Sequence, residues 1–125
     1  MHDKGDSGSA SDFCAWLPAY ISRGAHPIDV HAARGSGQEV IRLEQAAYVP
    51  YRALITKDFP NLLVAGRCIS ADRKALASLR VQASCMGLGQ AAGTAAAQSL
   101  SEGKYVQDID TSTLVSKLRE MGAVI

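Results

Sequence analysis

The first half of the chain alternates apolar and polar positions over short stretches. Residues 28–31 read Ile-Asp-Val-His, a period of two that predicts a short strand. Residues 39–54 predict a strand, a turn and a second strand, with Pro50 at the end of that second strand or at an edge. We therefore expect a short β-ribbon between residues 26 and 54.

A continuous apolar run dominates the middle of the chain. Residues 62–65 read Leu-Leu-Val-Ala, follow the turn-forming sequence Phe-Pro-Asn at 59–61, and end at Gly66. A run without alternation is typical of a strand that is covered on both faces. The sequence thus predicts a central buried strand at residues 61–65. The mixed pattern of residues 71–83 is compatible with a helical turn or two.

Two segments after this run have helical spacing. The first covers residues 84–100, and the second covers residues 111–121. The second helix is predicted to begin at a cap formed by Asp110 or Thr111 and to end at Gly122. Its buried face should consist of three side chains, those of Leu114, Leu118 and Met121.

Three glycines, Gly87, Gly89 and Gly93, could belong to a phosphate-binding turn or to a helix. A dinucleotide-binding turn needs a strand directly before it, and Ser84, Cys85 and Met86 form no strand. Glycine costs a helix about 1 kcal/mol relative to alanine. We therefore interpret these residues as glycines inside a tightly packed helix, where they let a neighbour approach closely.

Composition limits the classes of protein. The chain has 125 residues, 13 basic and 12 acidic, and three cysteines without a Cys-x-x-Cys pair. This near-neutral charge predicts neither a nucleic acid nor a membrane as partner, and the cysteines favour a reducing, cytoplasmic setting. Residues 1–12 have no apolar run for a signal segment. We expect a flexible N-terminal tail at residues 1–16, a Gly-rich loop at 33–38, and one domain from 17 to 125.

Two polar groups are candidates for chemistry. His26, Asp29 and His31 could suggest a metal site, but only Asp29 and His31 share a strand face, so we predict no metal and interpret His31 as facing a substrate or a polar surface. Arg80 lies between the apolar run and the start of the first helix. There it either binds a carboxylate or another anion, or forms a surface ion pair.

Several segments together resemble a known family. The sequence is similar to the C-terminal part of FAD-dependent oxidoreductases related to fumarate reductase flavoprotein subunits, and the similarity extends over residues 17–125. The segments that carry it are HPIDVHAARGSG at 26–37, VPYRAL at 49–54, NLLVAGRCIS at 61–70, ALASLRVQ at 75–82, CMGLGQAAGTAAA at 85–97 and LREMGAVI at 118–125.

The resemblance implies a fold and site residues. The fold would be α/β, the C-terminal part of a glutathione-reductase-like FAD-binding fold, with the short β-ribbon, the central buried strand and two packed helices. The resemblance places Ala65, Gly66 and Arg67 at the ribityl or phosphate region of FAD. It places backbone N–H groups of Ser84, Cys85 and Met86 at the flavin ring, where they would stabilise negative charge. Arg80 would hold the substrate carboxylate, and we group His31 with it as catalytic.

The resemblance also implies what this sequence lacks. Family members begin with a strand and a G-x-G-x-x-G turn for the ADP half of FAD, and no such turn occurs here in the right context. We therefore expect a fragment, a split-gene product or one subunit completed by a second chain. On its own the chain should not retain FAD and should form a homo-oligomer through apolar surface. The alternative is a non-catalytic binding or structural module that self-associates.

Overall fold

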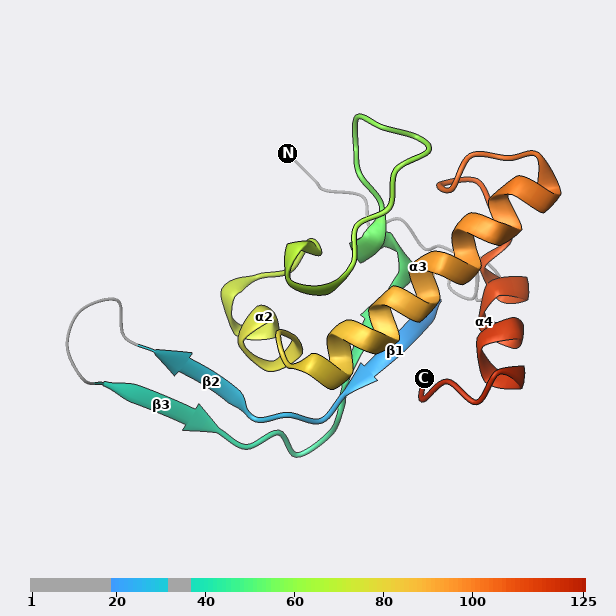
Figure 1. Ribbon diagram of the computed structural model, residues 1–125. Coiled ribbons are helices and arrows are strands. Elements are labelled where there is room, and N and C mark those ends of the chain that lie inside the picture. Colours follow the sequence, from blue (N-terminus) through green and yellow to red (C-terminus); the bar gives the residue numbers. More distant parts are fainter. Residues whose placement is uncertain (1–18, 32–36) are drawn as a thin grey trace, which may run out of the picture.

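The computed structural model describes residues 19–31 and 37–125 (Figure 1). The predicted tail at residues 1–16 and residues 33–36 of the predicted Gly-rich loop lie outside the described residues. The described chain forms, in order, β1 (Tyr20–Gly24), β2 (Ile28–His31), β3 (Gln38–Ile41), β4 (Ala47–Pro50), the 3-10 turns η1 (Tyr51–Leu54) and η2 (Gly66–Cys68), α2 (Arg73–Leu79), α3 (Gln82–Glu102) and α4 (Thr111–Glu120).

The four strands form one interrupted antiparallel ribbon. β1 pairs with β4 and β2 pairs with β3, so the second pair continues the first towards the tip of the ribbon (Figure 1). Pro50 ends β4, where its missing N–H costs no ladder hydrogen bond. The predicted ribbon is therefore confirmed in part: β2, β3 and β4 lie within residues 26–54, but β4 pairs with β1, a strand that the sequence did not predict, and β3 and β4 do not pair with each other.

The prediction of a central buried strand at residues 61–65 is wrong. Leu63 forms a single bridge with Ile55, and the Val64 N–H donates to the Leu54 carbonyl over 2.8 Å. The Leu62 side chain is 46% exposed. A strand buried on both faces needs a neighbour at each edge and a layer on each face. Among the described residues, the segment at Leu54 and Ile55 is the neighbour on one edge of this run, and the run is irregular and half-buried.

The core lies where α3 crosses the inner face of β1 and α4 packs beside it (Figure 1). Its fully buried members are aliphatic side chains from the ribbon, η1 and the two long helices: Ile21, Val49, Leu54, Leu88, Leu114 and Leu118. Both predicted long helices are confirmed. α3 begins two residues before and ends two residues after the predicted 84–100, and α4 ends one residue before the predicted 121. The arrangement is a small α/β unit with three helices among the described residues.

The ends of α4 follow the predicted signals, but one of its face residues does not. Asp110 caps the helix, and Gly122 closes it with a φ of 76°. Leu114 and Leu118 are fully buried, whereas Met121 is 52% exposed. The placement of Met121 on the buried face is wrong because this residue is the C-cap, where the chain leaves the helical spiral.

The helix glycines differ in what surrounds them. All three lie inside α3, as predicted. A Cβ at Gly87 would lie 2.9 Å from the Ser22 hydroxyl oxygen, so this glycine lets α3 approach β1. At Gly89 and Gly93 nothing lies within 4 Å of the Cβ position. Tight packing is therefore confirmed for Gly87 and wrong for the other two.

Alanine substitutions should separate these two cases. We expect Gly93→Ala to stabilise the isolated chain by about 0.5–1 kcal/mol, because alanine has the better helix propensity and the added methyl meets open space. Gly87→Ala should destabilise it, since Ser22 would have to move. Urea unfolding followed by circular dichroism measures both. Equal effects of the two substitutions would contradict this packing of α3 on β1.

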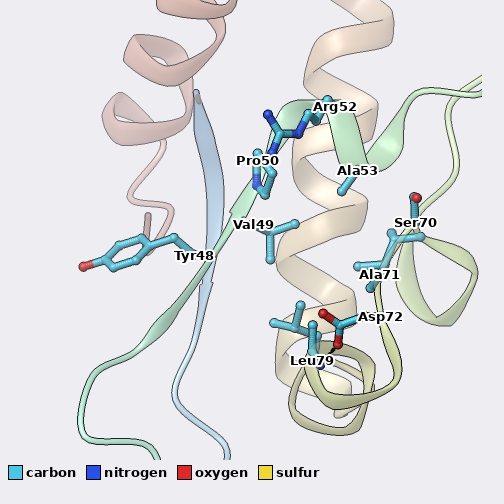
Figure 2. Close-up of a pocket in the computed structure, with 11 residues that line it drawn as sticks. Tyr48, Val49, Pro50, Arg52, Ala53, Ser70, Ala71, Asp72 and Leu79 are labelled. Atoms are coloured by element: carbon cyan, nitrogen blue, oxygen red, sulfur yellow. Dashed lines mark hydrogen bonds between the residues drawn. The ribbon is translucent and has the colours of Figure 1, made fainter. Parts of the chain in front are cut away.

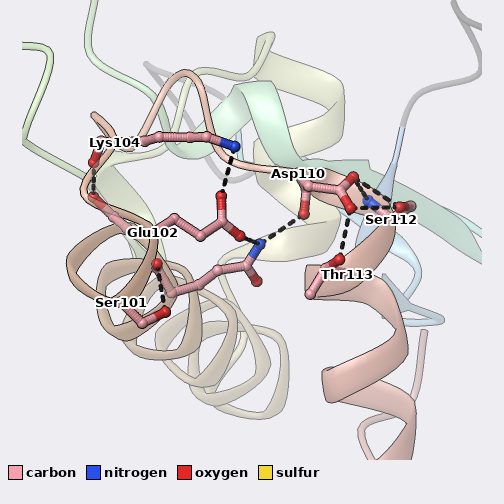
Figure 3. Close-up of polar contacts among 8 residues, drawn as sticks. Ser101, Glu102, Lys104, Asp110, Ser112 and Thr113 are labelled. Atoms are coloured by element: carbon pink, nitrogen blue, oxygen red, sulfur yellow. Dashed lines mark hydrogen bonds and ion pairs between the residues drawn. The ribbon is translucent and has the colours of Figure 1, made fainter.

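A polar network joins the end of α3 to the start of α4 (Figure 3). The Gln98 side-chain NH₂ donates to Glu102 Oε1 over 2.7 Å and to the Asp110 carbonyl over 2.8 Å. The Lys104 ammonium lies 3.0 Å from Glu102 Oε2. Because Gln98 is buried, these contacts fix the angle at which α4 returns along α3.

Stability should depend on the ionisation of Asp110. Hydrogen bonds from the Thr113 hydroxyl and then from the Ser112 hydroxyl and amide lower the pKa of Asp110 from 3.8 to about 2. A carboxyl with a depressed pKa stabilises the fold above its unfolded value and loses that contribution as pH falls through the folded value. Wild type should thus exceed Asp110→Asn in stability at pH 6, and the difference should shrink between pH 4 and pH 2. Urea midpoints across this range test it; a pH-independent difference would refute the assignment.

Candidate functional site

The predicted cofactor residues of the middle segment lie against the start of α3. Gly66, with a φ of 76°, opens η2, and a Cβ at its position would lie 3.8 Å from both Cβ and Sγ of Cys85. The Nε–H of Arg67 donates to the Arg80 carbonyl over 3.1 Å. Two predicted segments that are far apart in sequence, residues 65–67 and 80–85, are therefore brought together.

The start of α3 differs from the prediction by two residues. Val81 is the N-cap and Gln82 the first helical residue, and the Cys85 amide already donates to the Val81 carbonyl over 3.0 Å. The N–H groups without a partner inside the helix are thus those up to Ser84. Because the helix begins before Ser84, the Cys85 amide is already bonded within α3, and the contact of Cys85 with a ligand stays a prediction. The Met86 amide lies still deeper in the helix.

Three predicted ring-side residues point in different directions from α3. Ser84 is buried against β1, with its hydroxyl oxygen 3.2 Å from the position of a Cβ on Gly24. Cys85 faces η2, and Met86 is 68% exposed. One ligand cannot contact all three side chains on the same side of the helix. The Cys85 side chain is the one that faces the 65–67 segment.

Arg80 is paired with β2. The Nη2 nitrogen of Arg80 donates to the Asp29 carbonyl over 3.1 Å and lies 3.4 Å from Asp29 Oδ2. The side chains are 38% and 20% exposed, which makes this a partly solvated ion pair. The structure thus shows the ion-pair alternative for Arg80. Among the described residues, both side-chain hydrogen bonds of Arg80 are donated by Nη2.

His31, the second predicted catalytic residue, is the last residue of β2. Its backbone pairs with Gln38, and its side chain lies outside what the structure describes. His26 is exposed, and its Nδ1 lies 2.7 Å from the Pro27 carbonyl oxygen. In residues 19–31 and 37–125, no group of three or more His, Cys, Asp or Glu side chains is arranged to hold a metal ion.

Cavities lie beside several of these elements in the part of the chain that the structure describes. A cavity of about 340 Å³ lies between β4 and α2, with Val49, Ala53 and Leu79 in its walls (Figure 2). Figure 2 shows Tyr48 pointing away from this space, and no predicted site residue lines it. Two further cavities are lined by predicted site residues, one by Ser84 and the other by Arg80.

The other two cavities flank the candidate site. A wide groove of about 680 Å³ runs beside the start of α3, where Ser84 lines it together with the end of β1 and the C-terminal segment. A small cavity of about 180 Å³ lies between α2 and β2. It contains Arg80, Asp29 and Arg73. Arg73 was not predicted, although its spacing of seven residues from Arg80 places both on one helix face.

Comparison with known proteins establishes the family. The sequence model of the FAD dependent oxidoreductase family matches residues 14–120, which is most of the chain. This chain therefore belongs to the FAD-dependent oxidoreductase family. No curated protein and no solved structure matches it. Among the helices of the described residues, none is both long and apolar enough to cross a bilayer.

Proposed function

We propose that this chain contributes the ribityl and ring side of the FAD site of an FAD-dependent oxidoreductase. The observation that carries the proposal is the packing of η2 on the start of α3, where a Cβ at Gly66 would lie 3.8 Å from Cys85 and the Arg67 Nε–H donates to the Arg80 carbonyl. Family membership supports FAD as the cofactor. The proposal assigns Ala65, Gly66 and Arg67 to the ribityl and phosphate region.

The residues at this junction fit an electron-rich ligand. The first turn of α3 has no acidic side chain, and Val81 offers no side-chain cap. The positive end of a 21-residue helix is thus uncompensated by its own residues. N–H groups of Gln82, Ala83 and Ser84 would donate to the pyrimidine edge of the ring. When bound, FAD would supply acceptance of a hydride or of electrons.

The substrate side of the proposed site is formed by α2 and β2. Arg80 would bind an anionic group of the substrate with the guanidinium nitrogens that Asp29 leaves open. His31 follows Asp29 by two positions on the same strand and would face the substrate as a proton donor or acceptor. Arg80 links α2 and β2 to the proposed cofactor segment, residues 65–67, because its carbonyl accepts a hydrogen bond from the Arg67 Nε–H.

The adenosine half of FAD would need other residues. The glycines at 87–93 lie inside α3 and form no phosphate-binding turn. Residues of a longer chain or of a second chain would therefore hold the pyrophosphate and adenosine. We expect these 125 residues alone to bind FAD weakly, because the immobilisation entropy of a large ligand, about 4 kcal/mol or more, is offset only on the ring side.

Comparing flavins of different length tests this assignment. FAD and FMN should bind the 125-residue chain with dissociation constants within about threefold of each other, because the AMP portion contacts nothing. Gly66→Ala should weaken FMN binding, since a side chain at a φ of 76° strains η2 and adds an atom beside Cys85. Gly103→Ala is the matched control, with a φ of 63° at the far end of α3.

Calorimetry and flavin fluorescence, with light scattering on the same samples, measure these affinities and the oligomeric state. FAD bound a hundredfold tighter than FMN would refute the restriction to the ring side. Weak binding above micromolar concentration is the expected result, and a folded chain that binds neither flavin at millimolar concentration would refute the flavin site itself. Equal losses in Gly66→Ala and Gly103→Ala would show that η2 does not contact the ring or ribityl chain.

A second candidate function is self-association without catalysis. One face of α3 supports it, because Met86 is 68% exposed, Leu100 is 85% exposed and the space above Gly93 is open. Leu62, within the irregular 61–65 segment, adds a further exposed apolar side chain. A stable oligomer that binds no flavin under the conditions above would favour this second function over the first.

A further inference from the structure

A wide groove runs between the end of β1, the first turns of α3 and the C-terminal segment. Its volume of about 680 Å³ is in the range of small-molecule sites, roughly 300–1,000 Å³. Arg23 and His26 line it, and among the described residues no acidic side chain does. Most of the other lining residues are glycine, alanine or valine. The groove therefore suits an apolar ring that carries electron-rich groups.

One buried hydroxyl group in this groove has no hydrogen-bond partner. Ser84 lines the groove and is 5% exposed. Within residues 19–31 and 37–125, no group forms a hydrogen bond with its Oγ atom. Two other buried serines, Ser78 and Ser99, donate to the carbonyls of His26 and Lys104. A buried hydroxyl without a partner destabilises a fold, so a ligand that supplies the partner would be favoured.

Gly24 keeps open the space beside this hydroxyl. A Cβ at Gly24 would lie 3.2 Å from Ser84 Oγ and 2.8 Å from Leu79 Cδ2, so a larger residue would press on both. The turn after Gly24 is held in place, because the Ser78 hydroxyl donates to the His26 carbonyl over 2.6 Å. This wall of the groove is thus fixed in a position that leaves the Ser84 hydroxyl within reach of a ligand.

We infer that the Ser84 hydroxyl selects the imide edge of the flavin ring by accepting a hydrogen bond from the ring N3–H group. The inference rests on the proposed flavin site and adds a side chain to the backbone N–H groups assigned there. Those N–H groups can bond only to ring atoms that accept, whereas N3–H is a donor and needs an acceptor, which the Ser84 oxygen provides. The inference also places the pyrimidine edge on the β1 side of α3, where Ser84 lies, rather than on the side of Cys85.

Methylation of the flavin at N3 tests this contact, because it removes the N3–H group. FMN and N3-methyl FMN are titrated against the 125-residue chain and against its Ser84→Ala variant, with flavin fluorescence as the signal. Wild type should bind FMN about tenfold more tightly than N3-methyl FMN. Ser84→Ala should weaken FMN binding about tenfold and change the affinity for N3-methyl FMN by less than about twofold.

Thermal unfolding of the free chain provides a second readout. Ser84→Ala should match or exceed wild type in melting temperature, because the hydroxyl that it removes has no partner. Ser99→Ala is the matched control, since Ser99 is a buried serine near the other end of α3 whose hydroxyl donates to the Lys104 carbonyl. It should lower the melting temperature and leave both flavin affinities within about twofold of wild type. A Ser84→Ala chain that melts well below wild type would show that the hydroxyl serves the fold, and would overturn the inference.

The outcomes separate this inference from the proposed function. A wild-type chain that binds neither FMN nor N3-methyl FMN at millimolar concentration would overturn the flavin site and this inference together. Equal FMN affinity in wild type and Ser84→Ala would overturn the inference alone and leave the flavin site standing. Equal losses of FMN and N3-methyl FMN in Ser84→Ala would also overturn it, because the hydroxyl would then not act at N3.

Discussion

In the complete, FAD-loaded enzyme that we propose, Arg80→Lys is expected to lower turnover about a hundredfold while the flavin content stays unchanged. Arg80 Nη2 is occupied by Asp29, and the other guanidinium nitrogens are open. Lysine has a single terminal nitrogen, which can serve either Asp29 or a substrate anion but cannot span both. The Arg80 carbonyl that binds Arg67 is backbone, so the contact with the cofactor segment is retained.

The measurement is steady-state turnover with flavin absorbance on the same preparation, using the substrate that the wild-type enzyme converts. Arg119→Lys provides the matched control, because Arg119 is exposed on α4 and lines none of the cavities at the site. Wild-type turnover in Arg80→Lys would make Arg80 a structural residue that only ties β2 to α2. Loss of flavin in parallel with turnover would instead assign Arg80 to cofactor binding.

Leu118→Ala should destabilise the chain by about 3 kcal/mol, the second large effect we expect. Leu118 is fully buried in the core that α4 shares with α3 and β1. Truncation removes buried methyl groups and leaves a cavity that a helix tied at both ends cannot close. For a domain with a free energy of unfolding of roughly 5–15 kcal/mol, this loss is a large fraction of the total.

Met121→Ala is the comparison, because the helical pattern alone assigns both residues to one face. Met121 is 52% exposed, so its truncation should change the free energy of unfolding by less than about 0.5 kcal/mol. Urea unfolding at constant pH measures both variants. Similar losses in the two would mean that α4 packs along its whole length, contrary to the C-cap position of Met121.

The local signals in the sequence were sufficient for the two long helices and for β2, but they did not predict β1, and they indicated no more than a helical turn or two where α2 lies. Asp110 and Gly122 marked the ends of α4 because capping and left-handed backbone depend on the residue itself. The period of two at residues 28–31 identified β2 for the same reason. Local patterns failed at residues 61–65, where the same apolar run suits a buried strand only if other strands and layers cover it.

Family-specific residues were also visible in the sequence, but their contacts were not. The sequence determined that this chain belongs with FAD-dependent oxidoreductases, because short segments such as NLLVAGR and CMGLGQAAG are specific without any knowledge of contacts. Only the tertiary structure decided that Arg80 contacts Asp29 and that Arg73 lines the same cavity as these two residues. The same holds for the placement of Gly66 beside Cys85. Such contacts join residues far apart in the chain, and they depend on how α2, β2 and η2 pack rather than on any local pattern.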